Sequence, residues 1–253
     1  MTPEPFRILS LGAGVQSTTL LLMAEHEGWA PDAAVFADTG WEPKAVYAHL
    51  DWLERVSSVP IHRTSGGDIR ADMVEGRFPK APLFVRRSDG KRTMLGRQCT
   101  REYKVYPVRR WLQANREKRP VELWLGISID EAARMRDSGR QYITHRYPLI
   151  ERMLSRQDCL NWMRSHGYPQ PPKSACVGCP YRKDSQWLDI RNSPEEWADA
   201  VAVDEAIRRP SKIDGEAYLH RQLVPLPQVI LQPEDIGQEV FGFTNECEGM
   251  CGV

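Results

Sequence analysis

Short continuous apolar runs alternate along the chain with runs whose apolar residues recur at helical spacing. The continuous runs at 6–11 and 33–38 predict two buried strands. Residues 17–27 carry apolar side chains at helical spacing and predict a helix between those strands. Residues 42–56 predict a second helix, with Pro43 in its first turn. The chain therefore begins as a strand–helix–strand–helix unit.

The same pattern continues beyond this unit. Apolar runs at 59–64 and 121–128 predict further strands, and residues 156–165 and about 194–209 predict further helices. Alternation of this kind is typical of a doubly wound α/β fold, in which helices cover both faces of a mostly parallel sheet. Residues 65–104 show neither period and are interpreted as a long functional insertion rather than a core element.

Two domains are expected from the change in composition along the chain. Residues 1–165 form the α/β domain, and residues 166–253 form a loop-rich region with a CxxC motif and a cysteine-bearing tail.

Overall composition narrows the class of protein. The 253 residues carry a formal net charge of zero, and no stretch approaches the roughly 20 apolar residues of a membrane-spanning helix. The N-terminus has no basic segment followed by an apolar core, so no signal peptide is expected. We therefore expect a soluble, cytoplasmic protein with no membrane partner. Six cysteines are too few for a disulfide scaffold and point to metal or redox chemistry.

A glycine-rich loop separates the first strand from the first helix. This geometry directs backbone N–H groups and the positive end of the helix toward an anion, commonly a phosphate. The loop lacks both the dinucleotide pattern GxGxxG and the lysine of a phosphate loop, and an ordinary tight turn is the alternative. The residues expected at such an anion site are Ser10, Gly12, Ala13, Gly14, Gln16, Ser17 and Thr18.

The second strand also ends in polar residues. Asp38, Thr39 and Gly40 follow it directly, at the edge of a parallel sheet where ligands commonly bind. Asp38 is a candidate to bind an adenosine hydroxyl or a metal-bound water, and a carboxylate that caps a helix is the alternative.

The segments "SLGAGVQSTTLLLM" and "VFADTGWEPKAVYAHL" together resemble the phosphoadenosine phosphosulfate (PAPS) reductase branch of the adenine nucleotide alpha hydrolase superfamily. The resemblance implies a PP-loop that wraps the phosphates of ATP, with Mg²⁺ as a companion ion, or the phosphosulfate of adenylyl sulfate or PAPS. The pyrophosphatase form of the loop is SGGxDS; Gly12 and Gln16 replace its first serine and its aspartate, which disfavours ATP hydrolysis more than nucleotide binding. In "LGISIDEAARMR", the resemblance places Asp130, Glu131 and Arg134 at the border of the nucleotide.

Four cysteines are candidate metal ligands. Cys176 and Cys179 form the CxxC motif, and Cys99 and Cys159 lie upstream. Four thiolates suit a 4Fe–4S cluster or a structural Zn²⁺ ion, and their spacing does not choose between them. Similarity of "QCTREYKVYP" to a cysteine block of adenylyl-sulfate reductases implies the cluster, although Thr100 replaces the second cysteine of that block. Cys159 then becomes the candidate fourth ligand, with a small buried hydrophobe as the alternative.

The tail "FGFTNECEGMCGV" resembles the mobile C-terminal segment of sulfonucleotide reductases. The resemblance makes Cys247 the nucleophile that attacks the sulfonucleotide sulfur, with a thioredoxin-like thiol donor then releasing sulfite. Lys104 is expected near both cluster and substrate. Cys251 has no counterpart in that segment; it could resolve Cys247 as a disulfide or ligate the cluster.

A basic stretch at 86–119 suits either the phosphates of a nucleotide or the backbone of a nucleic acid, and a solvated helix face is the alternative. The leading hypothesis is an oxidoreductase that reduces adenylyl sulfate or PAPS. The second is an ATP pyrophosphatase that activates DNA or tRNA for iron–sulfur-dependent thiolation, with a cysteine desulfurase as sulfur source. The third is a non-catalytic nucleotide-binding module with a zinc knuckle.

Overall fold

A five-stranded parallel sheet forms the centre of the protein. The computed structural model describes residues 3–75, 80–211 and 213–233. All neighbouring strands of the central sheet pair in parallel, and their order is β3-β2-β1-β6-β7. The strands are β1 (Phe6–Leu11), β2 (Ala33–Asp38), β3 (Ile61–Ser65), β6 (Val121–Leu125) and β7 (Ile143–Arg146). The order confirms the predicted doubly wound α/β fold.

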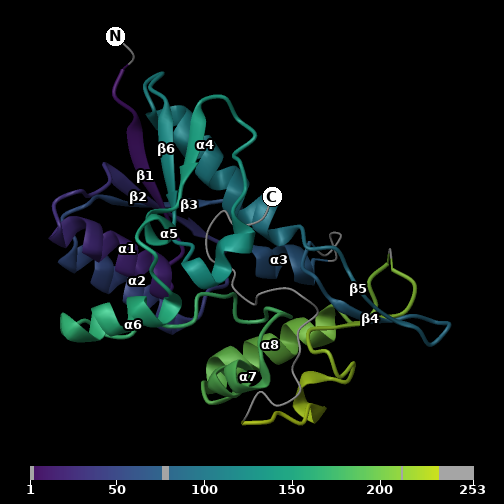
Figure 1. Ribbon diagram of the computed structural model, residues 1–253. Coiled ribbons are helices and arrows are strands. Elements are labelled where there is room, and N and C mark those ends of the chain that lie inside the picture. The colour runs from purple at the N-terminus through teal and green to yellow at the C-terminus, as the bar shows by residue number, and fades with distance from the viewer. Residues whose placement is uncertain (1–2, 76–79, 212, 234–253) are drawn as a thin grey trace.

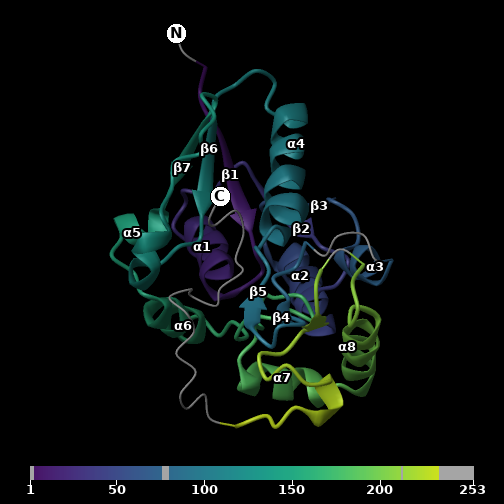
Figure 2. The same cartoon turned by 90° about the vertical axis from the view of Figure 1, so that its right-hand side faces the viewer.

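Helices cover both faces of this sheet (Figures 1 and 2). On one face lie α1 (Val15–His26), α2 (Lys44–Val56) and α6 (Arg156–Ser165), and on the other lies α4 (Tyr106–Asn115). Successive side chains of a strand point to opposite faces. Because helices cover both faces of the sheet, β1 and β2 are mostly apolar rather than alternating.

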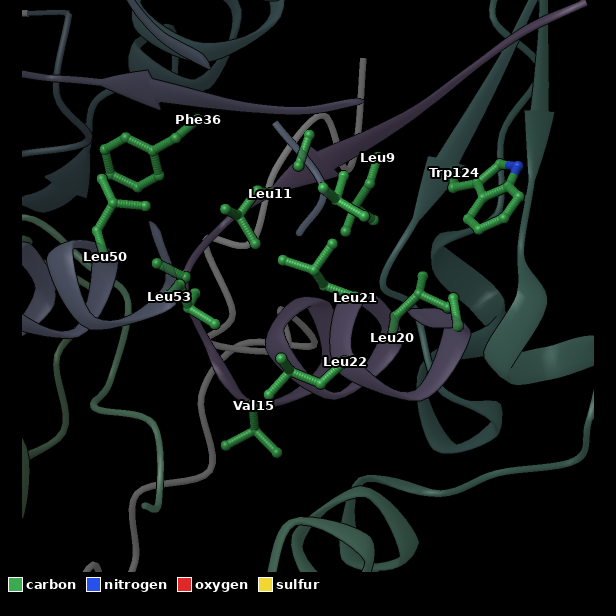
Figure 3. Packing of buried hydrophobic residues seen from close by; sticks show 14 of the residues in the cluster. Leu9, Leu11, Val15, Leu20, Leu21, Leu22, Phe36, Leu50, Leu53 and Trp124 are labelled. Atoms are coloured by element: carbon green, nitrogen blue, oxygen red, sulfur yellow. The ribbon is translucent and has the colours of Figure 1, made fainter. Parts of the chain in front are cut away.

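Two separate cores result from this layering. The first packs Leu9 and Leu11 of β1 against α1 and α2, as Figure 3 shows. The second packs Ile8 of the same strand against Val108 and Leu112 of α4. Alternate residues of one strand therefore belong to different cores.

A third core lies beyond the carboxyl edge of the sheet (Figures 1 and 2). It contains the antiparallel sheet β5-β4-β8. Its elements are α3 (Ile69–Val74), β4 (Phe84–Arg86), β5 (Arg92–Met94), α7 (Asp184–Arg191), α8 (Pro194–Ala206) and β8 (Glu216–Tyr218).

This third core corrects the interpretation of residues 65–104 as an insertion without core residues. Leu83 and Val85 are fully buried there, and Tyr103 is almost so. The elements of this segment are three to six residues long, too short to show a period in the sequence.

Short helical turns complete the described chain. A π-helix, η1 (Thr100–Val105), runs directly into α4, and the 3₁₀ turn η2 (Ile129–Arg134) follows β6. The others are α5 (Pro148–Glu151) and the 3₁₀ turn η3 (Leu226–Gln228). Among the described residues, no helix combines the length and the apolar character needed to cross a membrane.

Candidate functional site

The loop between β1 and α1 is closed by its own side chains. The Gly12 N–H donates to Ser17 Oγ at 3.1 Å, and Ser17 Oγ in turn donates to the Gly14 carbonyl at 3.4 Å. Ala13 has a φ of 55°, in the left-handed region that non-glycine residues seldom adopt. No acidic side chain lies in the first turn of α1, and no side chain caps Gly14. The positive end of α1 is therefore not neutralised by its own first turn.

The loop lies where the direction of chain winding reverses. From β1 the chain proceeds to β2 on one side of the sheet, and β6 pairs with β1 on the other. A Cβ at Gly126, directly after β6, would lie 2.8 Å from the backbone nitrogen of Ser17. Only glycine allows the two segments to approach so closely. Ligands of open α/β sheets bind at this kind of reversal point.

Gln16 joins this loop to η2. Its Nε2 donates to Glu131 Oε2 at 3.0 Å and to Ser128 Oγ at 3.4 Å. Glu131 also pairs with Arg134 at 2.5 Å. Gln16 is fully buried, and its Oε1 has no hydrogen-bond partner among the described residues. Gln16 thus connects the loop to Glu131 and, through it, to Arg134. Their predicted contact with a nucleotide stays a prediction.

Asp130 has a different placement. Its exposed carboxylate accepts the backbone N–H of Arg156, the first residue of α6. This contact corresponds to helix capping.

Asp38 lies at the carboxyl end of β2 with one oxygen occupied. Its Oδ1 accepts the Gly40 N–H and the Tyr47 hydroxyl, each at 2.8 Å. Burial and this hydrogen bond raise the pKa of Tyr47 above its ordinary value. Gly40 has a φ of 75°, so it makes the turn that brings its N–H back to the carboxylate. Neither contact caps a helix, because the N-cap of α2 is Pro43 and no side chain caps it; Oδ1 instead closes the turn at Gly40.

Two other predicted loop residues are buried. Ser10 is 3% exposed, and Thr18 is fully buried with its hydroxyl 3.0 Å from His49 Nε2. Burial lowers the pKa of His49 to about 4. A neutral imidazole therefore faces the first turn of α1.

Three of the predicted metal ligands line one pocket. Cys99 comes from the residue before η1, while Cys176 and Cys179 come from the CxxC turn. The thiol donors thus gather from segments about 80 residues apart. Within residues 3–75, 80–211 and 213–233, no three His, Cys, Asp or Glu side chains are arranged so that they could hold a metal ion. The donor types suit a thiolate-held centre, but the side chains as placed do not form one.

Cys159 is not one of the residues lining this pocket. It is fully buried on α6, within the core that α1 and α6 share. Its carbonyl accepts a hydrogen bond from Thr19 Oγ1 at 3.4 Å. Its position matches the predicted alternative, a small buried hydrophobe.

Lys104 borders both the thiol pocket and the loop after β1. It lines the pocket of the three cysteines, and it lines a second, smaller cavity with Ser10, Leu11 and Gly12. π-Helical segments are often found at functional sites. The π-helix η1 places Cys99, the residue before it, and Lys104 on the same pocket.

The ammonium group of Lys104 forms a buried ion pair. Its Nζ lies 3.6 Å from Glu42 Oε1, and the side chains are 8% and 1% exposed. The same Oε1 accepts the Thr39 hydroxyl at 3.0 Å, and that hydroxyl lies 3.3 Å from Cys176 Sγ. A chain of polar contacts therefore links Lys104 to a thiol.

The CxxC turn is held by residues that the motif alone did not reveal. The Val177 N–H donates to the Trp41 carbonyl at 2.8 Å. A Cβ at Gly178 would lie only 2.1 Å from Trp41 Cη2, so glycine is required where the turn meets the indole. The indole Nε1 donates to Asp199 at 2.6 Å, which fixes the ring.

Arg182 is a second residue that holds the CxxC turn in place. Its guanidinium donates to the carbonyls of Ala175, Cys176 and Val177 at 2.7 to 3.1 Å. Burial lowers the pKa of Arg182, while the nearby Cys179 and Cys176 act in the opposite direction. Arginine remains charged even so, which places a buried cation beside two thiols. In the sequence, its place three residues after a CxxC was the one available signal.

The predicted nucleophile, Cys247, lies outside the described residues, as do Phe241, Gly242, Glu246 and Cys251.

No protein-family model and no curated protein sequence matches this chain. Among solved structures, the chain is similar to a crystal structure of phosphoadenylyl-sulfate (PAPS) reductase from Candida auris in complex with phosphate. The two share 10% sequence identity with a TM-score of 0.43, over 66% of this chain and 76% of that chain.

Proposed function

We propose that the chain is an enzyme that binds an adenine nucleotide at the loop of residues 12–17 and performs sulfur chemistry at the adjoining thiol pocket. The favoured reaction is reduction of adenylyl sulfate or PAPS to sulfite. The observation that carries this proposal is the position of Lys104, which borders both the loop and the pocket of Cys99, Cys176 and Cys179. A cation at this position suits a substrate whose anionic phosphosulfate must lie between nucleotide and thiols.

Each part of the site has a role in this proposal. The amides around Gly14 and the positive end of α1 bind the phosphosulfate oxygens. Lys104 is oriented by its ion pair with Glu42, and its remaining ammonium N–H groups donate to the leaving phosphate. Gln16 contributes by holding Glu131 beside the loop.

The proposed reaction has two steps. The Cys247 thiolate attacks the sulfonate sulfur; an S–S bond forms, the S–O bond to phosphate breaks, and AMP or its 3′-phosphorylated form leaves. A thioredoxin-like dithiol then reduces the S-sulfocysteine, becomes a disulfide itself, and releases sulfite and the Cys247 thiolate.

A 4Fe–4S cluster or a Zn²⁺ ion would use Cys99, Cys176 and Cys179 as ligands. When bound, it would supply a charged centre that tunes the electrostatics of the pocket. Arg182 already donates to carbonyls of the turn that carries two of these thiols, which favours their anionic form.

A second candidate is an ATP pyrophosphatase that activates a nucleic acid for thiolation. It is favoured by a groove rich in arginine along α4, described below. Ser17 and Asp38 are compatible with Mg²⁺–ATP, and a cysteine desulfurase would supply the sulfur. Gln16, in place of an acidic residue, disfavours this reaction.

Parallel incubations distinguish the two candidates. Protein purified without oxygen is incubated with ATP, adenylyl sulfate or PAPS, together with thioredoxin, and both sulfite and pyrophosphate are measured. We expect sulfite from a sulfonucleotide, and a decrease of at least about 10³-fold in the Cys247→Ser variant. The Cys159→Ala variant is the matched control and should keep its activity. Pyrophosphate from ATP without sulfite, or full activity in Cys247→Ser, would refute the proposed reductase.

A further inference from the structure

A groove of about 400 Å³ runs along the exposed side of α4, outside the thiol pocket. Three segments of the chain line it: the turn after β3, the helical segment of η1 and α4, and the loop before β7. Its main side chains are Tyr106, Arg109, Arg110, Gln113, Arg140 and Tyr142. Three guanidinium groups and two phenol rings thus converge from regions distant in the sequence.

The three arginines carry no carboxylate partners among the described residues. Arg109 donates to the Ser138 carbonyl at 2.9 Å, and Arg110 donates to the Ser65 carbonyl at 3.4 Å. Both contacts orient the guanidinium without neutralising it. Arg109 Nε is buried and has no hydrogen-bond partner in the described structure. Their positive charge is therefore available to an anion.

Other arginines on this protein behave differently. Arg63 pairs with Asp51 and Glu54, and Arg152 pairs with Glu27. Glu102, a carboxylate that also lines the groove, already contacts Arg101 at 3.2 Å and Lys80 at 4.0 Å. The groove is consequently a local positive field on a chain whose formal net charge is zero.

The dimensions and rings of the groove indicate the kind of anion. The segment from Glu102 to Gln113 advances about 16 Å at 1.5 Å per residue. A fully stacked strand advances about 3.4 Å per nucleotide and an unstacked strand advances further, so the groove accommodates at most about five nucleotides. Tyr106 is 41% exposed, and the Tyr142 ring has the Arg116 guanidinium 4.4 Å from its centroid. Tyr142 is half-buried and already stacked by Arg116, whereas Tyr106 offers an exposed ring beside the positive track. Such a ring is typical of proteins that bind single strands by base stacking.

We propose that this groove binds a single-stranded nucleic acid, with Arg109, Arg110 and Arg140 contacting phosphates and Tyr106 stacking on a base. The binding goes beyond the proposed function, because none of these side chains belongs to the nucleotide loop or the thiol pocket. It can therefore be measured whichever reaction the enzyme performs.

Fluorescence anisotropy of the full-length protein with a labelled 12-nucleotide strand tests this proposal. Each phosphate contact contributes about −0.7 to the slope of log affinity against log salt, so three contacts predict roughly 20-fold weaker binding at 200 mM than at 50 mM NaCl. The variant Arg109→Gln/Arg110→Gln/Arg140→Gln should bind at least tenfold more weakly at 50 mM and lose most of this salt dependence. Tyr106→Ala should weaken binding fivefold or more.

A matched control removes the same charge elsewhere. Arg63→Gln/Arg146→Gln/Arg152→Gln also deletes three guanidiniums, but ones that pair with carboxylates. This control should bind the strand as wild type does. The Cys247→Ser protein should bind normally too, so a failure of the proposed reductase leaves the groove testable.

Three results would overturn the proposal. The first is no binding of DNA or RNA strands at 50 mM NaCl. The second is an equal loss in the control triple variant, which would indicate a general charge effect. The third is tighter binding of a 12-base-pair duplex than of the single strand. Circular dichroism of every variant, matched to wild type, shows that a loss of binding is not a loss of folding.

Discussion

The buried pair of Lys104 and Glu42 allows a quantitative prediction at the centre of the proposed site. Their charges lie 3.6 Å apart with exposed fractions of 8% and 1%. At an effective dielectric constant of about 20, unit charges at this distance attract by about 5 kcal/mol. The free-energy cost of removing both charged groups from water cancels much of this attraction. The pair as a whole therefore contributes little to the free energy of unfolding. Removal of only one partner leaves the other charge buried without this counter-charge.

We therefore expect a characteristic pattern in a double-mutant cycle. Lys104→Met and Glu42→Gln should each lower the free energy of unfolding by about 3–5 kcal/mol. The double variant should lose much less than the sum, which gives a coupling energy of about 3 kcal/mol between the two sites. Urea titration followed by tryptophan fluorescence measures all four proteins.

An exposed ion pair provides the comparison. Arg146 and Glu151 lie 3.1 Å apart, with side chains 40% and 44% exposed. Solvent screening should reduce their coupling to a few tenths of a kcal/mol. If the Lys104–Glu42 coupling is no larger than that of the exposed pair, the assignment of a desolvated charge pair between loop and thiol pocket is wrong.

Three further predictions follow from the residues around the site. Gly178→Ala should destabilise the protein by about 1–3 kcal/mol, because its Cβ would overlap the Trp41 ring; Trp41→Phe in the same chain should partly restore the melting temperature. Arg182→Met should cost about 1–3 kcal/mol in urea titration by leaving three carbonyls unmatched, and Arg182→Lys should not restore it, because an ammonium lacks the planar fork of donors. Burial holds the pKa of His49 at about 4 in the folded state, below the value of 6.5 in the unfolded chain, so the unfolded chain binds the proton first. The contribution of His49 to the free energy of unfolding should therefore be constant above about pH 6.5 and fall by up to about 3 kcal/mol toward pH 4. In the His49→Gln variant, the free energy of unfolding should depend less on pH over this range.

Local patterns in the sequence determined most of the α/β framework. The strand predicted at 33–38 has the same bounds as β2, and the helix predicted at 156–165 has those of α6. β2 is a continuous buried run, and α6 begins at a capping box formed by Ser155 and Asp158; the local sequence encodes both features directly. The glycine-rich loop was identified in the same way, since a strand, a turn and a helix adjoin one another in the chain.

The tertiary structure decided which residues meet at the site. Cys99, Cys176 and Cys179 share a pocket while Cys159 lies in a different core. The sequence had left open whether Cys159 joins the other three thiols. Arg182 acts through backbone carbonyls, so its partners cannot be read from side-chain types, although its place after the CxxC motif was a signal.

The arginine groove has the same origin. Arg109 and Arg140 belong to segments 31 residues apart, which only the packing of α4 beside the loop before β7 brings together. Sequence periodicity reports which face of an element is buried, because burial depends on the local repeat of the chain. The local repeat does not report which of these faces contact one another. Those contacts join distant segments and form only when the whole fold is assembled.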